Sequence, residues 1–288
     1  SDECEAGLRE IITFMRETEP GCRVIVQLNH AGRKASATRP WGEECRSVTP
    51  EEGGWPVRAP SAIPFAPGYA TPRPLHFEEC QRIVSAFGEA ARRAVSAGAD
   101  GIEIHMAHGY LIHQFLSPLS NRRIDEYGGA LENRMRFARE VMDAVMNAVP
   151  ERTAVGLRVS ATDWVPEGWM PEDTLALVRA AHARGLHFVD VSTGGNTPDA
   201  KIPVGPGYQV PFASRIKAET GMPVLAVGLI RDAWQAETIL REGAADMVDI
   251  GRAMLDDPNW GWHAASELHV KEVPVLVVPP QYRRGLRC

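Results

Sequence analysis

The stretch "IVSAFGEAARRAVSAGADGIEIHMAHGY" (83–110) contains one complete copy of the pattern that decides the fold. Its first part places apolar residues at helical spacing, at Ile83, Phe87, Ala90, Ala91, Ala94 and Val95. Gly98 follows, and helices commonly end on a glycine because it adopts left-handed backbone angles without steric cost. The apolar run 101–105 then predicts a strand that is buried on both faces, as strands of parallel sheets are.

The same succession of helix, glycine and strand recurs along the chain. Six apolar runs predict strands, at Val24–Leu28, Gly101–His105, Ala154–Ser160, Phe188–Ser192, Val224–Val227 and Met247–Ile250. Helical segments precede or separate them, including 3–18, 131–149 and one that opens at Asp232, where Gln235 suggests a capping box. Glycines 98, 185, 221 and 243 each stand between a helical segment and a strand. Consecutive units of this kind indicate a parallel sheet with right-handed crossovers.

The predicted fold class is α/β, a TIM (β/α)8 barrel with about six of its eight βα units present in this chain. An open doubly wound sheet is the alternative, and it has less support because no G-x-G-x-x-G turn follows any strand. We expect a single domain over residues 1–288 that is incomplete at its N-terminus, since the first helix has no strand before it. A proline-rich excursion on the substrate side is expected at 34–74, and a C-terminal tail at 270–288.

Composition excludes several classes of protein. The chain has 288 residues, 44% of them apolar, which argues against a wholly disordered chain. A net charge of −6 argues against nucleic acid as a partner, because phosphate binding needs a basic face. No window reaches the roughly 18 apolar residues of a membrane span. Five scattered cysteines without a C-x-x-C pair favour free thiols over a metal or iron–sulfur site.

Polar and glycine residues stand where each predicted strand ends, and this is where α/β proteins place their functional groups. They are Gln27, Asn29 and His30; His105, His108 and Tyr110; Arg158; Ser192, Gly194 and Gly195; Gly228; and Gly251 with Arg252. The last two ends, "AVGLI" (226–230) and "IGRAM" (250–254), predict a phosphate site, because glycine admits backbone N–H groups and Arg252 adds a charged fork. Tight turns are the alternative explanation of these glycines.

The densest polar cluster is "HMAHGYLIH" (105–113). We interpret His105 and His108 as paired donors to one oxygen atom and Tyr110 as a general acid, since a phenol is protonated at neutral pH. A metal site that includes His113 has less support, and His113 is expected to be structural. Arg158 ends an apolar strand, where it faces either a ligand or an internal salt bridge.

At these residues the chain resembles the old yellow enzyme family of FMN-dependent ene-reductases, and in particular its bacterial-type branch of NADPH dehydrogenases and xenobiotic reductases. The resemblance rests on "QLNHAGRKA" (27–35), "HMAHGYLIHQFLSPLSNRRIDEYGGALENRMRF" (105–137), "GLRVSATDW" (156–164), "VDIGRAMLDDP" (248–258) and "PPQYRRG" (279–285).

The resemblance implies an FMN- and NADPH-dependent oxidoreductase that reduces the activated C=C bond of small α,β-unsaturated carbonyl compounds. It implies that Gln27 and Arg158 bind the flavin pyrimidine edge, and that Gly228, Gly251 and Arg252 bind its phosphate. His105 and His108 would bind the substrate carbonyl, and Tyr110 would protonate the α-carbon. Arg284 matches an arginine that enters a neighbouring subunit's site, which implies a homodimer or homotetramer. No metal and no membrane partner are implied, and the expected location is the cytoplasm.

The resemblance also leaves alternatives open. Family members begin with two βα units that this chain lacks, so we expect weakened FMN binding, and a non-catalytic remnant is one alternative function. A dienoyl-CoA reductase or amine dehydrogenase is another, although those proteins carry further C-terminal domains and an iron–sulfur cysteine cluster. A histidine-bound metallohydrolase is the last.

Overall fold

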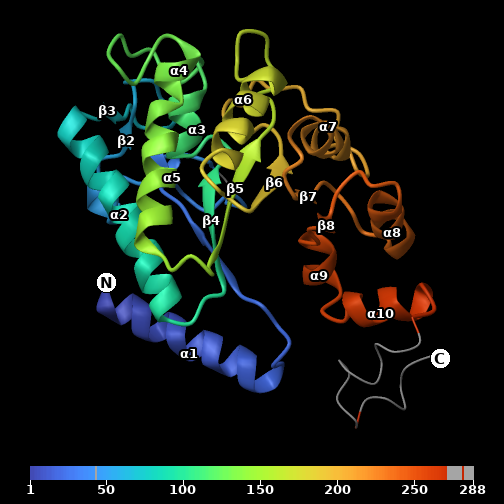
Figure 1. Ribbon diagram of the computed structural model, residues 1–288. Helices are drawn as coiled ribbons and strands as arrows, with labels where there is room; N and C mark the ends of the chain where they lie inside the picture. The colour runs from blue at the N-terminus through green and yellow to red at the C-terminus, as the bar shows by residue number, and fades with distance from the viewer. Residues whose placement is uncertain (43, 271–280, 282–288) are drawn as a thin grey trace.

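The computed structural model describes residues 1–42, 44–270 and 281, and Figure 1 shows strands and helices alternating along the chain. The strands are β1 (Ile25–Leu28), β2 (Arg58–Ala59), β3 (Arg73–Pro74), β4 (Gly101–Met106), β5 (Ala154–Ser160), β6 (Phe188–Ser192), β7 (Val224–Ala226) and β8 (Met247–Val248). The helices are α1 (Asp2–Thr18), α2 (Phe77–Ser96), α3 (Leu111–Leu116), α4 (Leu131–Arg134), α5 (Arg136–Ala148), α6 (Pro171–His182), α7 (Val210–Thr220), α8 (Ala233–Arg241), α9 (Arg252–Asp256) and α10 (Trp260–Glu267). Two 3₁₀ turns, η1 (Gly32–Lys34) and η2 (Pro50–Glu52), lie between β1 and β2.

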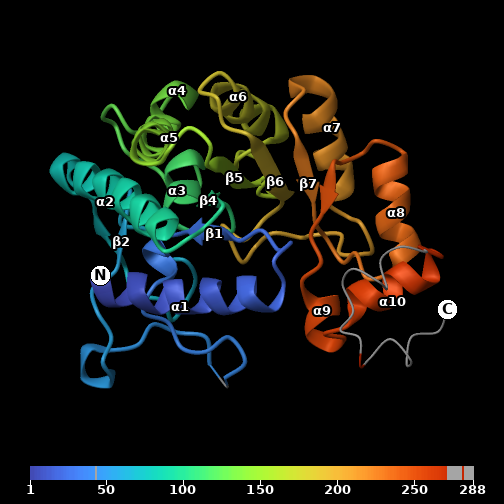
Figure 2. The same cartoon turned by 60° about the horizontal axis from the view of Figure 1, so that its bottom comes forward.

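Six strands form one parallel sheet in the order β1-β4-β5-β6-β7-β8. All six correspond to the apolar runs of the sequence, with small shifts at their ends, so the predicted α/β class and the partial barrel are confirmed. Figure 2 shows helices α2, α5, α6, α7 and α8 as an arc outside these strands. Among the described residues, no strand pairs with the outer edge of β1 or of β8.

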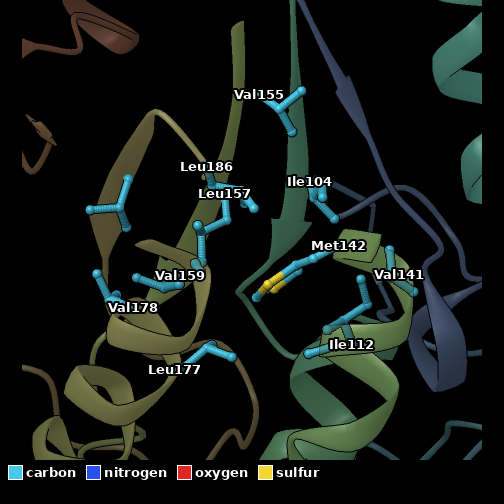
Figure 3. Close-up of a cluster of buried hydrophobic side chains, with 14 of the residues drawn as sticks. Ile104, Ile112, Val141, Met142, Val155, Leu157, Val159, Leu177, Val178 and Leu186 are labelled. Atoms are coloured by element: carbon cyan, nitrogen blue, oxygen red, sulfur yellow. The ribbon is translucent and has the colours of Figure 1, made fainter. Parts of the chain in front are cut away.

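The main hydrophobic core lies between the outer face of the sheet and this arc of helices. Alternate strand residues point outward, and Figure 3 shows them packed against helical side chains. The labelled residues are Ile104, Val155, Leu157 and Val159 from strands, Ile112, Val141, Met142, Leu177 and Val178 from helices, and Leu186 from the turn after α6. All ten are at most 3% exposed. Because every second residue is used for this core, the intervening residues are free to face the inside of the curved sheet.

Two details differ from the sequence prediction. The excursion at 34–74 is not structureless, because it contains η2 and the two-stranded sheet β2-β3. The helix predicted over 131–149 is divided at Met135 into α4 and α5. The helix ends that were predicted from glycine are confirmed, since glycines 98, 185, 221 and 243 all have positive φ. Of the C-terminal tail, only Val270 and Gln281 belong to the described residues.

No helix in the described part of the chain is long and apolar enough to cross a membrane. The four described cysteines, Cys4, Cys22, Cys45 and Cys80, are unpaired.

Candidate active site at the ends of the parallel strands

The register of the sheet brings the polar strand residues together on its inner face. Gln27 of β1 is level with Glu103 of β4. His105 is level with Arg158 of β5. Arg158 is in turn level with Asp190 of β6. Neighbouring parallel strands lie about 5 Å apart, so these side chains stand next to one another. The apolar pattern therefore fixes the site indirectly, since it decides which residues face inward.

Most of the residues predicted to bind the cofactor line one cavity of 230 Å³. Its lining includes His108, Arg158, Gly228, Gly251 and Arg252, which come from four different strand ends. Tyr208, Gln209, Arg231 and Asp249 also line it. Three arginines around one cavity make it suitable for an anionic group.

The backbone conformation at position 228 requires a glycine. Its φ is +130°, which side chains rarely allow, and an added Cβ would lie 3.1 Å from Nε2 of Gln209. Gln209 Nε2 donates to the carbonyl oxygen of Val227 at 3.2 Å, and Gln209 Oε1 accepts from Thr193 Oγ1 at 2.8 Å. The glycine turn after β7 is thus closely packed against one ordered side chain. Beside Gly251, in contrast, an added Cβ would meet no atom within 4 Å.

His105 and His108 contact each other beside this cavity. His108 Nδ1 lies 3.3 Å from His105 Nε2, and His108 Nε2 lies 2.6 Å from Ser192 Oγ. Burial, with a further contribution from Arg158, lowers the pKa of His105 to about 3. Burial and the neighbouring His105 lower the pKa of His108 to about 2. Both imidazoles are therefore neutral at physiological pH.

Tyr110 lies against this histidine pair. Its ring centroid is 5.3 Å from that of His105, in an edge-to-face arrangement. Tyr110 directly precedes α3, and its backbone N–H donates to the carbonyl oxygen of Ala107. The three residues predicted to carry the chemistry are therefore neighbours.

Arg158 is held by a buried carboxylate. Its Nε lies 2.9 Å from Oδ2 of Asp190, whose side chain is 1% exposed. Burial and the nearby Asp249 raise the pKa of Asp190, whereas Arg158 opposes this shift. The internal salt bridge considered for Arg158 is thus present, and Arg158 lines the cavity as well.

Gln27 has a different environment from the one expected. Its Nε2 donates to Glu103 Oε1 at 2.6 Å, and it is not among the residues that line the cavity. Burial raises the pKa of Glu103, and the bond from Gln27 and the charge of Arg158 oppose the shift. Gln27 therefore joins the site through Glu103 in this structure. Arg284 lies outside the described residues.

His113 is structural, as predicted. Its Nδ1 accepts from the backbone N–H of Gly109 at 2.9 Å, and its Nε2 lies 3.1 Å from Oδ1 of Asp163. Asp163 Oδ2 also accepts from Ser117 Oγ at 2.5 Å and from the backbone N–H of Trp169 at 2.9 Å. This buried network holds the loop between His108 and Tyr110. Among the described residues, no three His, Cys, Asp or Glu side chains form a group that could hold a metal ion.

Sequence reasoning missed Lys34 and Asp190. Lys34 Nζ donates to the carbonyl oxygens of His108 at 2.9 Å and Gly195 at 3.0 Å, so it joins the loops that follow β4 and β6. Burial, and then Arg33, lower the pKa of Lys34 to about 8. In the sequence, only the position of Lys34 just after the polar end of β1 indicated a role in the site. Asp190 lies within the apolar run 188–192, and the only indication of its role in the sequence was a single carboxylate among apolar residues.

The fold and this site define an α/β-barrel protein whose functional groups gather at the carboxyl ends of parallel strands. The chain belongs to the NADH:flavin oxidoreductase / NADH oxidase family, whose model matches residues 2–271. This is the old yellow enzyme family that the motifs indicated, and its members are flavin-dependent oxidoreductases.

Individual relatives agree with this assignment. The chain is 46% identical over 281 residues to an NADPH dehydrogenase of Geobacillus thermodenitrificans, covering 98% of this chain and 75% of the relative. The structure of morphinone reductase in complex with tetrahydroNAD matches with a TM-score of 0.71 and 27% identity, over 92% of this chain and 72% of the other. A 2-naphthoyl-CoA reductase complex matches with a TM-score of 0.79 and 24% identity, which shows a shared fold. This chain covers 42% of it and the match includes 96% of this chain.

Proposed function

We propose that the protein is an FMN-dependent NADPH dehydrogenase that reduces the activated C=C bond of α,β-unsaturated carbonyl compounds. The observation that carries this proposal is the shared location of His108, Arg158, Gly228, Gly251 and Arg252 around one cavity. His105 and Tyr110 adjoin His108, so groups suited to binding a cofactor and groups suited to binding a carbonyl oxygen are neighbours.

The residues present fit FMN. Arg252 and Arg231 line the cavity together with Gly228 and Gly251, and the open space beside Gly251 leaves room for a phosphate there. Arg158 uses Nε for Asp190, and its two terminal nitrogens have no hydrogen bond to another described residue. They are available to the polar edge of the flavin, where a cation stabilises the negative charge of the reduced ring. Gln27 would contribute to the same flavin edge, because Glu103 engages only one of the two N–H groups of its amide.

Bound FMN would supply the hydride chemistry between NADPH and the alkene. The chain's own residues prepare the substrate for this transfer. His105 and His108 hold the carbonyl oxygen, which draws electron density away from the β-carbon. Tyr110 donates the proton that the α-carbon needs, because a phenol keeps its proton at neutral pH.

The partners we propose are small activated alkenes and further copies of this chain. Arg284 would complete the site of a neighbouring subunit in a homodimer or homotetramer. Histidine-bound metal chemistry is not part of the proposal, because Gly109 and Asp163 account for both nitrogens of His113.

Anaerobic half-reactions test this function. The protein is loaded with FMN and mixed with NADPH, and flavin bleaching is followed by absorbance; 2-cyclohexenone is then added. The proposal expects bleaching by NADPH and recovery of the oxidised spectrum with formation of cyclohexanone. A chain that takes up FMN but reacts with neither compound would be a non-catalytic remnant of the family, and the proposal would then be wrong.

A further inference from the structure

The turn that follows β7 is held from one side by the segment before α7. Gln209 Nε2 donates to the carbonyl oxygen of Val227 at 3.2 Å. The backbone N–H of Gly207 donates to the carbonyl oxygen of Gly228 at 2.8 Å. One short segment therefore engages two successive carbonyl groups of the turn, and the φ of +130° at Gly228 allows the backbone to take this path.

Holding these two carbonyl groups also fixes the N–H groups of the same peptides. A trans peptide places its C=O and its N–H on opposite sides, so the N–H groups of Gly228 and Leu229 point away from the segment 207–209. No described residue accepts a backbone hydrogen bond from either of them. Both residues line the cavity of 230 Å³. Successive free N–H groups of a turn are suitable donors to an anion.

The chemistry of its partners determines the orientation of the Gln209 amide. The carbonyl oxygen of Val227 can only accept, so the NH₂ group of Gln209 must face it. Oε1 of Gln209 then accepts from Thr193 Oγ1 at 2.8 Å. Gln209 is 4% exposed and Thr193 is 5% exposed, so both bonds are shielded from solvent. The side chain thus connects the end of β6 to the turn after β7 in a single arrangement.

We propose that Gln209 is a positioning residue of the cavity, because it holds the turn after β7 so that the N–H groups of Gly228 and Leu229 donate to a phosphate group. Gln209 acts through the turn, since its own donor is used by Val227. The identification of that phosphate as part of FMN rests on the proposed function. The arrangement of the turn rests only on the hydrogen bonds above.

The first experiment uses inorganic phosphate without flavin. Phosphate is titrated into the nitrogen-15-labelled chain, and NMR follows the backbone amides of Gly228 and Leu229. We expect both signals to shift until the site is saturated. Gln209→Met keeps a side chain of similar length without hydrogen bonds, so the Kd for phosphate should rise about 3- to 10-fold. No response of these amides in the wild type, or an unchanged Kd in Gln209→Met, would overturn the proposal.

Thr193 provides a graded test of the same arrangement. Thr193→Val removes the hydroxyl group that orients the amide of Gln209, but the bond from Gln209 to Val227 can still form. The Kd for phosphate should therefore rise less than in Gln209→Met, by about 2- to 3-fold. Thr193→Ser keeps the hydroxyl group and should restore the wild-type Kd. A full loss in Thr193→Ser would contradict the role of this hydrogen bond.

Gln114 provides the matched control. It is fully buried, its Nε2 donates to the carbonyl oxygen of Gly109 at 2.7 Å, and its Oε1 accepts from the backbone N–H of Arg33 at 3.2 Å. Gln114 thus joins two loops as Gln209 does, but it is not among the residues that line the cavity. Gln114→Met should leave the Kd for phosphate unchanged. Equal weakening in the two methionine variants would indicate a general structural effect and overturn the proposal.

The second experiment compares FMN with riboflavin, which lacks the phosphate. In Gln209→Met the Kd for FMN should rise about 3- to 10-fold, whereas the Kd for riboflavin should change by less than about twofold. Equal weakening of both flavins would mean that Gln209 does not act on the phosphate. A wild type that binds neither flavin contradicts the proposed function instead, and the amide response to inorganic phosphate still decides the role of Gln209.

Discussion

At the residue scale, three histidines of one short segment have different roles because they have different partners. His113 has both ring nitrogens engaged, by Gly109 and Asp163, and is fully buried. His105 and His108 bond to each other, and His108 lines the cavity. Spacing along the chain does not separate these cases. The roles differ because the partners of the ring nitrogens differ. Since Gly109 and Asp163 contact the ring of His113, this histidine supports the loop that contains His108 and Tyr110.

Asp163 gives this support a measurable pH dependence. Burial alone raises its pKa, but the charge and hydrogen bond of His113 and the bonds from Ser117 and Trp169 outweigh this and lower it to about 2. The ordinary pKa in an unfolded chain is about 3.9. The carboxylate therefore contributes stability that is fully present above pH ~4 and is lost as the pH falls toward 2.

The Asp163→Asn variant should lack this contribution. Between pH 5 and pH 2, the free energy of unfolding in urea should fall by roughly 2 kcal/mol more in the wild type than in the variant, because a shift of one pKa unit corresponds to about 1.4 kcal/mol. Parallel pH curves for the two proteins would show that Asp163 is not stabilised by this network.

Tyr110→Phe tests the role of the phenol. Only alkene reduction needs its proton, so that half-reaction should slow by about a hundredfold or more, the usual range for a lost general acid. Flavin reduction by NADPH should change by only a few fold. Stopped-flow absorbance measures both steps, and equal slowing of the two would contradict the assignment.

At the element scale, the site depends on two loops that pack backbone to backbone. The loop after β4 contains His108 and Gly109, and the loop after β6 contains Gly195. A Cβ on Gly109 would lie 2.3 Å from the carbonyl oxygen of Gly195, and a Cβ on Gly195 would lie 2.7 Å from the Cα of His108. Lys34 bonds to both loops from η1. His108 itself has φ of +58°, which this packing maintains.

Gly195→Ala should therefore be more harmful than an ordinary loop substitution. Gly221, at the end of α7, is the matched control: its φ of +68° is also positive, but an added Cβ meets no atom within 4 Å. Gly221→Ala should cost about 1–2 kcal/mol of backbone strain. Gly195→Ala should cost roughly 1–3 kcal/mol more because of the steric clash. Urea unfolding measures both, and equal losses would mean that the loops are not closely packed.

Helices and strands could be predicted from the sequence where the burial of apolar residues alone determines them. The six strands were found because strands covered on both faces are continuous apolar runs. The small sheet β2-β3 was missed because each of its strands has only two residues, which is too short to produce an apolar pattern. The pairing of Arg158 with Asp190 depends on strand register, which a single sequence does not reveal.

At the scale of the whole molecule, no strand in the described part of the chain pairs with the outer edge of β1 or of β8. Ile25 of β1 and Met247 of β8 are apolar, yet they are 44% and 47% exposed. Unpaired strand edges with apolar side chains promote association between copies of a protein. The described chain therefore combines a closely packed outer core with two edges that are available for pairing.

Lysine at both edges should reduce this association. Sedimentation velocity should show concentration-dependent association of the wild type, and less of it in the double variant Ile25→Lys and Met247→Lys, because edge charges oppose pairing. Trp41→Lys is the control, since Trp41 is 80% exposed but lies outside the parallel sheet. Equal association of all three proteins would exclude the sheet edges as its cause.

The central claim is that the strand ends form one cavity for a flavin that carries a phosphate. Titration of the protein with FMN and with riboflavin, which lacks the phosphate, tests it most directly. We predict that FMN binds at least about tenfold more tightly, as expected for one charge-assisted contact, and that Arg252→Ala removes the difference. Equal binding of the two flavins by the wild type, or no binding of either, would contradict the account.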